Sequence, residues 1–188
     1  KDGKFEKILS KSEFGESKYL DITLKNDTSS NKKILEIFSD DSKPLLANYS
    51  FFKDIKDGKL LFLSKFDKVE SSASLTIEDF KVQNAPGFAR LLSLADFGGV
   101  ADLLSGEGLS FEILEIKFTN SEDVMRIEEL YAIGPSISIL IDGYVDNKSG
   151  LTSLKGTMIP AKDLNKLISK IPLLGKILVP KEIGEGIF

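Results

Sequence analysis

The sequence predicts a mainly β fold of the α+β class, in which a curved antiparallel sheet carries a central apolar helix and short amphipathic helices. Three observations support this fold class. Short segments of alternating apolar and polar residues, typical of half-buried strands, recur through most of the chain. The loops between them are short, so consecutive strands are expected to pair antiparallel. One segment, residues 84–104, is instead apolar at helical spacing on most sides.

The first half of the chain predicts hairpins and one short helix. The turn NDTSSN separates two alternating segments. Lys43-Pro44 follows two acidic residues and a serine, which is typical of a helix start, and the apolar stripe that follows is expected to run through Ile55 and to end near Asp57-Gly58. The apolar phase shifts at Glu78-Asp79, which predicts a β-bulge. The strands expected here are residues 4–9, 18–25, 33–39, 59–67 and 70–83.

Residues 84–104 are expected to form the central helix. Pro86 suits a first helical turn, and Gly98-Gly99 predicts a kink or a break. The charged residues and the glycine pair argue against a membrane span. Two interpretations stay open: a core helix packed on the sheet, or a helix that plugs or lines a lipid-facing groove. The residues expected to cover such a groove are Phe88, Leu91, Leu92 and Phe97.

The second half predicts four closely spaced strands and an apolar tail. The phase of residues 109–119 shifts, as it does at Glu78-Asp79. An amphipathic helix is expected over residues 164–171, and it ends at Pro172. The tail is expected either to pack against a sheet edge or to be a membrane-proximal or groove-lining element. The strands expected here are residues 109–119, 124–133, 137–145 and 151–159.

Composition predicts one domain and excludes several chemistries. The 188 residues suffice for a single domain, 1–188, and a division into sub-units 1–83 and 84–188 is the alternative. The chain has no His and no Cys, which excludes thiol catalysis, His-based acid–base catalysis and Cys/His zinc sites within it. A net charge of −4 predicts no affinity for nucleic acid. Adjacent acidic residues point to opposite faces of a strand, so we expect no catalytic residue, no metal and no cofactor.

Neither a signal peptide nor a membrane span is visible in the sequence. The chain opens without Met and closes on GEGIF, which reads as the start of another strand. We therefore expect a piece of a longer protein, with any membrane anchor outside it.

Four stretches together resemble a known family. They are SDDSKPLLANYSFFKDIKDGKLLF, ASLTIEDFKVQNAPGFARLLSLADFGGVADLLSGEGLSFEILE, ELYAIGPSISILIDGYVD and GTMIPAKDLNKLISKIPLLGKIL. In order they cover most of residues 39–188, and the pattern is similar to the AsmA-like C-terminal domain of YhdP-like bacterial envelope proteins. The first 38 residues carry little of the resemblance, and the surface is richer in Lys and Asn.

The resemblance implies a non-enzymatic segment of a bridge-like lipid-transfer protein. Such a parent protein is anchored in the inner membrane through regions outside this chain and extends across the periplasm. The resemblance also implies that phospholipid moves between the inner and outer membranes along an apolar β-groove of this protein. The implied partners are phospholipid acyl chains and adjoining segments of the same parent chain. The family has no known catalytic residues, so the resemblance assigns no catalytic role to any residue of this chain.

An alternating strand in a curled sheet places every second residue inside, where aliphatic side chains can hold acyl chains away from water. From the sequence alone these residues face either lipid or the central helix. A structural or interaction module of an envelope scaffold, with a closed dry core, stays the alternative function. The candidate groove residues are Leu75, Ile77, Phe111, Ile113, Ile137, Ile139 and Ile141.

Overall fold

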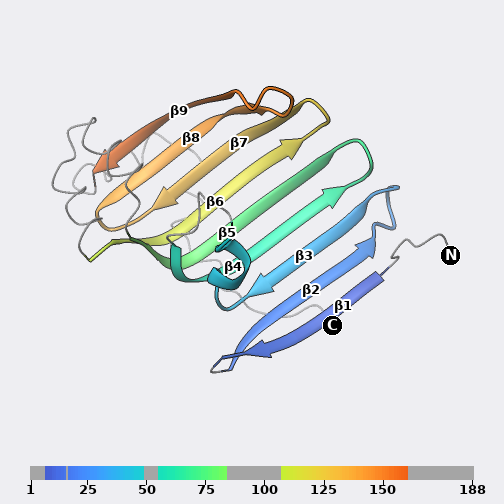
Figure 1. The fold of residues 1–188 in the computed structure, drawn as a ribbon, viewed down its shortest axis with the longest axis horizontal. Coiled ribbons are helices and arrows are strands. Elements are labelled where there is room, and N and C mark those ends of the chain that lie inside the picture. The colour runs from blue at the N-terminus through green and yellow to red at the C-terminus, as the bar shows by residue number, and fades with distance from the viewer. Residues whose placement is uncertain (1–6, 16, 49–54, 84–106, 161–188) are drawn as a thin grey trace.

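A computed structural model describes residues 7–15, 17–48, 55–83 and 107–160. Within these residues the chain forms one open antiparallel sheet, whose nine strands lie side by side in sequence order (Figure 1). β1 and β9 are therefore the two edges, and the expected antiparallel, mainly β architecture is confirmed. The strands are β1 (Lys7–Phe14), β2 (Lys18–Asn26), β3 (Lys33–Ser39), β4 (Ile55–Phe66), β5 (Ser71–Val82), β6 (Leu109–Asn120), β7 (Val124–Ile133), β8 (Ile137–Asp146) and β9 (Thr152–Pro160).

The described residues contain one helix, the short α1 (Lys43–Leu46), which begins where Lys43-Pro44 predicted a helix start. The prediction that this helix runs through Ile55 is wrong. Ile55 is the first residue of β4 and pairs with Val82, so strand pairing outweighs the helical spacing of the preceding apolar residues. The central apolar helix over residues 84–104 and the helix over residues 164–171 lie outside the described residues, and nothing in the described part supports them.

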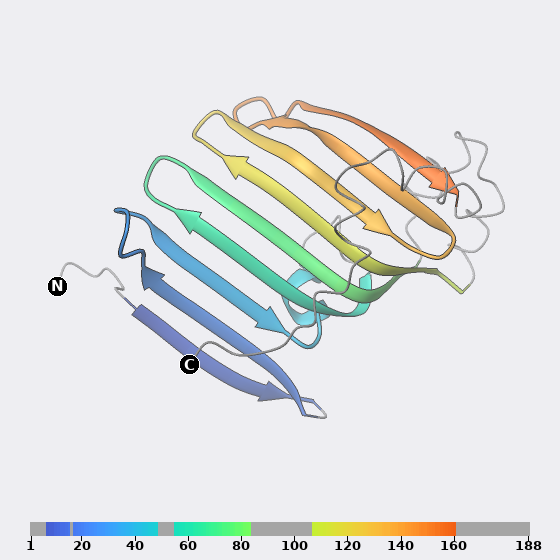
Figure 2. The ribbon, with the colours of Figure 1, turned by 180° about the vertical axis from the view of Figure 1, so that it is seen from behind.

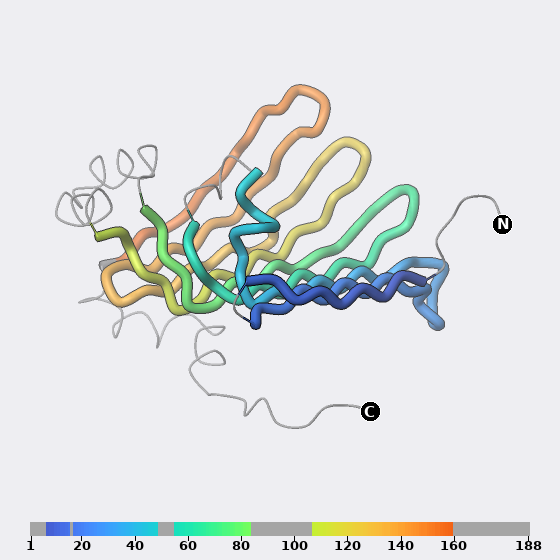
Figure 3. Tube along the Cα trace, turned by 60° about the horizontal axis from the view of Figure 1, so that its bottom comes forward, coloured from blue at the N-terminus to red at the C-terminus, as the bar shows by residue number. Residues whose placement is uncertain are grey.

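The sheet is twisted and curved, and α1 lies on one side of it only (Figures 1 and 2). Figure 3 shows that β7–β9 and the ends of β4–β6 turn toward the side on which α1 stands. We call this side the concave face and the other side the convex face. Leu46 of α1 belongs to the same buried cluster as Leu60 and Ile77 of the sheet, so the main core lies on the concave face.

The change of apolar phase at Glu78-Asp79 is present, but it is not the predicted β-bulge. Pairing between β4 and β5 keeps one register on both sides, with Asp57 opposite Phe80 and Lys59 opposite Glu78. The backbone instead kinks where Gly58 and Asp79 adopt positive φ angles of 87° and 53°. Because both strands kink together, no extra residue is inserted. The register shifts lie further along the sheet, where β7 pairs with β6 and β8.

Beyond this kink, the apolar residues of β4, β5 and β6 that face the core lie at alternate positions of opposite parity. Ile55, Phe80 and Phe111 are buried on the far side of the kink, and the rings of Phe80 and Phe111 stack with centroids 5.2 Å apart. The buried Ser42 holds the kink in place. Its hydroxyl donates to the carbonyl of Asp57 at 2.6 Å, and its N–H donates to the carbonyl of Gly58 at 2.8 Å.

Candidate functional site: an apolar face of the sheet

Three neighbouring rows of residues cross the concave face from β1 to β9. In an antiparallel sheet, residues directly opposite each other share a face, so the register of successive pairs defines each row. None of the residues in the three rows is charged. The inner row is Ser12, Leu20, Ser39, Leu60, Ile77, Leu114, Ala132, Ile139 and Met158; the middle row is Ser10, Ile22, Ile37, Phe62, Leu75, Ile116, Leu130, Ile141 and Gly156; the outer row is Ile8, Leu24, Leu35, Ser64, Ala73, Phe118, Ile127, Gly143 and Leu154.

The rows differ in how much of their surface is covered. Leu60, Ile77 and Leu114 of the inner row are buried beside the kink. In the middle and outer rows, many large side chains are only half-buried, and Leu154 on β9 is 50% exposed. A largely apolar, uncharged band therefore lies between the closed core and the hairpin turns, with half-buried side chains on either side of the buried Leu75 and Ile116.

The convex face has a different composition over the same strands. Lys117 on this face lies 2.8 Å from Glu115 and 3.3 Å from Glu129, and Lys155 lies 3.3 Å from Asp142. The rows on this face mix charged, polar and apolar side chains. The two faces of one sheet are thus chemically distinct, and only the concave face carries three adjacent rows that stay uncharged across all nine strands.

Most of the groove residues predicted from the sequence lie on the concave face or in its core. Leu75, Ile77, Ile139 and Ile141 occupy the inner and middle rows. Ile113 does not join them, because it lies opposite Glu78 and Ile133 on the convex face. Ile137 and Phe111 are buried in the main core, the latter beyond the kink. Phe88, Leu91, Leu92 and Phe97, predicted to cover the groove, lie outside the described residues.

The sequence interpretation missed the part of the band formed by β2, β3 and β4. Ile22, Leu24, Leu35 and Ile37 lie in the middle and outer rows and are half-buried. The signal was present, because apolar and polar residues alternate strictly in residues 18–25. Alternation alone gives a shared face but no register, so the rows could not be assembled from it.

Ion pairs and amide contacts join neighbouring hairpins at the end of the sheet formed by the β2–β3, β4–β5, β6–β7 and β8–β9 turns. Lys32 in the β2–β3 turn lies 2.6 Å from Glu70 in the β4–β5 turn. The side-chain amide of Asn147 donates to Asn120 at 2.9 Å and to the carbonyl of Ser121 at 2.8 Å, which links the β8–β9 and β6–β7 turns. These contacts fix the spacing of the hairpins that border the apolar band.

Asp27 is the most heavily bonded of these turn residues. Its carboxylate lies 2.5 Å from the Nζ atom of Lys65, and it also accepts hydrogen bonds from the backbone N–H of Ser29 and the hydroxyls of Ser29 and Ser30. The hydrogen bond from Lys65, followed by those from the serines, holds the pKa of Asp27 well below its usual range. Asp27 thus joins the β2–β3 turn to β4 in its ionised form.

We predict that Asp27→Asn lowers the denaturant midpoint at pH 7. The native pKa is depressed, so ionised Asp27 stabilises the fold above its unfolded pKa of about 3.9, and this stabilisation is lost as pH falls toward the native value. Chemical denaturation from pH 7 to pH 2 should therefore show the variant and the wild type converging below about pH 4. Lys65→Gln should reduce the same pH dependence. A difference that stays constant across this range would contradict the assignment.

Several titratable groups of the described residues pair with one another. On the convex face, the hydroxyl of Tyr131 donates to Glu115, and burial raises the pKa of this tyrosine. The members of this network satisfy one another, since Lys117 pairs with both Glu115 and Glu129. In the part of the chain that the structure describes, no cluster of three or more potential metal-ligating side chains occurs. The one helix of the described residues, α1, is too short to span a bilayer.

No family model matches the chain, and neither the curated proteins nor the solved structures include a significant match to it.

Proposed function

We propose that this chain is a non-enzymatic lipid-transport segment of the AsmA-like type, and that its concave face holds phospholipid acyl chains. The proposal places it in a parent protein of the bacterial envelope that is anchored in the inner membrane, extends across the periplasm, and takes part in phospholipid transport between the two membranes. It draws support from the sequence resemblance and, above all, from one observation: the three uncharged rows that cross the concave face from β1 to β9.

The dimensions of this band suit an acyl chain. Nine strands have eight gaps between them, and at about 4.8 Å per gap the band is about 38 Å long across the strands. Residues two apart along a strand are about 7 Å apart, so the outer and inner rows are about 14 Å apart. Each methylene group removed from water contributes about 0.8 kcal/mol, so lipid tails need no specific polar partner to bind there.

The distribution of exposure also supports the proposal. A sheet face that serves only as core is expected to be covered along its length, whereas the middle and outer rows here keep half-buried Ile, Leu and Phe side chains. The hairpin contacts, including Lys32 with Glu70, join the turns that border this face. An apolar surface preformed by the pairing of nine strands loses little conformational entropy when it binds a flexible ligand.

Extraction of lipid from the purified chain tests the proposal. The chain should be expressed in a bacterial envelope, purified without detergent exchange, and extracted for lipid mass spectrometry. We expect phospholipid in an amount on the order of one molecule per chain, by mass action for a preformed apolar site. Repeated absence of bound phospholipid, together with protein adducts on crosslinking in cells, would overturn the proposal in favour of a scaffold module with a closed core.

A further inference from the structure

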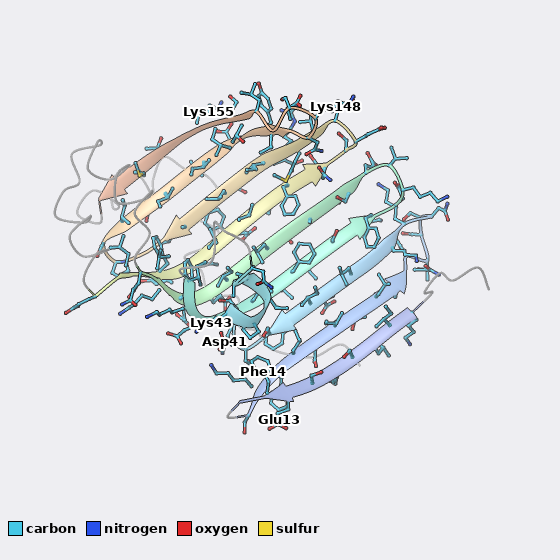
Figure 4. All side chains as sticks on the ribbon, in the orientation of Figure 1. Glu13, Phe14, Asp41, Lys43, Lys148 and Lys155 are labelled. Atoms are coloured by element: carbon cyan, nitrogen blue, oxygen red, sulfur yellow. The ribbon has the colours of Figure 1, made fainter. Side chains whose placement is uncertain are left out.

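β1 is an edge strand of the described sheet and carries its own charge pattern. Among the described strands it pairs only with β2, so within this part of the chain its outer backbone groups have no strand partner. Its residues from Leu9 to Glu13 are exposed, and Leu9 retains 65% of its surface. Figure 4 shows Glu13 and Phe14 at the end of β1, on the border of the sheet.

We propose that β1 pairs with β1 of a second copy of this chain, antiparallel and centred on Ser10. The two-fold axis would stand perpendicular to the sheet, so that the concave faces of both copies lie on the same side. The result is one continuous sheet in which the apolar rows of one copy run into those of the other. This inference concerns the β1 edge and stands independently of whether lipid binds the concave face.

The charges on β1 select this register. A two-fold axis perpendicular to the sheet pairs each residue of β1 with a residue of the second copy that lies on the same face. The axis must therefore pass between two copies of one residue, and the registers differ only in which residue this is. Centring on Leu9 places Lys7 opposite Lys11 of the second copy, and centring on Lys11 opposes the two lysines directly. Like charges directly opposite each other destabilise a strand pair.

Centring on Ser10 removes these conflicts. Lys7 then lies opposite Glu13 of the second copy, and the symmetry repeats this pair at the other end. Leu9 lies opposite Lys11, whose ammonium already pairs with Asp21 at 3.5 Å on its own sheet. Centring on Ser12 also matches Lys11 with Glu13, but it pairs only residues 10–14, whereas the Ser10 register pairs every residue from Lys7 to Glu13.

The opposite edge does not offer the same complementarity. β9 carries one charged residue, Lys155, which pairs with Asp142 of the neighbouring strand. Two copies of β9 would therefore bring no acid opposite a base. Lysines on an edge strand usually discourage pairing, and it is Glu13 that converts the β1 edge into a self-complementary one.

A cysteine scan measures this register directly, because the chain contains no native cysteine. Ser10→Cys places the two thiols opposite each other, with Cβ atoms about 5 Å apart, within reach of a disulfide. Ser12→Cys is the matched control: it is exposed on the same strand and face, but its counterpart lies four residues along, about 13 Å away. Under mild oxidation, Ser10→Cys should form at least about ten times more covalent dimer than Ser12→Cys.

Charge exchange supplies the second readout. Sedimentation velocity of the wild type should show a concentration-dependent dimer. Glu13→Lys places lysine opposite Lys7 at both ends and should weaken dimerisation at least about tenfold, and the Lys7→Glu/Glu13→Lys double variant should restore it. A monomer at every concentration, stronger crosslinking at Ser12 than at Ser10, or a double variant that stays as weak as Glu13→Lys would each overturn the proposal.

Discussion

Replacing Gly58 by alanine is expected to destabilise the chain by about 2–4 kcal/mol. Gly58 is buried at the kink of β4 with φ of +87°, where a side chain is strained. A Cβ atom there would lie 2.8 Å from both Ile77 Cγ2 and Phe80 Cβ. These two residues are core members on either side of the kink, so neither can move without opening the cluster.

Gly150→Ala is the control for Gly58→Ala. Gly150 also has a positive φ, of +72°, but a Cβ atom added there meets nothing within 4 Å. It therefore reports the backbone strain alone, about 1 kcal/mol. Urea denaturation of both variants separates the two contributions. Equal losses of stability would show that the kink is not packed as tightly as described, and would contradict its role in closing the core.

The second large effect is expected on bound lipid. Ile37→Glu places a charge in the middle row of the concave face, between Ile22 and Phe62. Burying an unpaired carboxylate among acyl chains is strongly unfavourable, so we expect at least about a fivefold loss of co-purified phospholipid. Mass spectrometry of extracted lipid, normalised to protein, measures this loss.

Ile34→Glu is the matched control for Ile37→Glu. Ile34 lies on the same strand, is also half-buried, and faces the convex side between Lys25 and Lys65. A glutamate there meets lysines, and bound phospholipid should stay near the wild-type amount. Equal losses in the two variants would indicate general destabilisation, and no loss in Ile37→Glu would remove the concave face from the site.

The strand pattern was predictable because alternation is a local property of the sequence. The segments 18–25, 33–39 and 124–133 match β2, β3 and β7 to within a residue. The phase change near Asp79 was also visible locally. The cause of this phase change was not predictable from the sequence. A bulge and a kink shared by neighbouring strands shift the apolar phase in the same way, and only the pairing of Asp57 with Phe80 distinguishes them.

The candidate site was only partly predictable, for the same reason. Leu75, Ile77, Ile139 and Ile141 were chosen from alternation, and the register brings them into shared rows. Ile113 was assigned to the face of Phe111 by simple alternation, but the phase changes between them and Ile113 lies on the other face. Which face is apolar across the sheet depends on pairing between strands, which no single segment encodes.

The most direct test of the central claim is photo-crosslinking in cells with benzoylphenylalanine at Ile22 or at Thr23. These half-buried neighbours on β2 point to the concave and convex faces respectively. The account predicts phospholipid adducts at position 22 and none at position 23, identified by mass spectrometry of the purified chain. Lipid adducts in equal amounts at both positions, or only protein adducts at position 22, would contradict it.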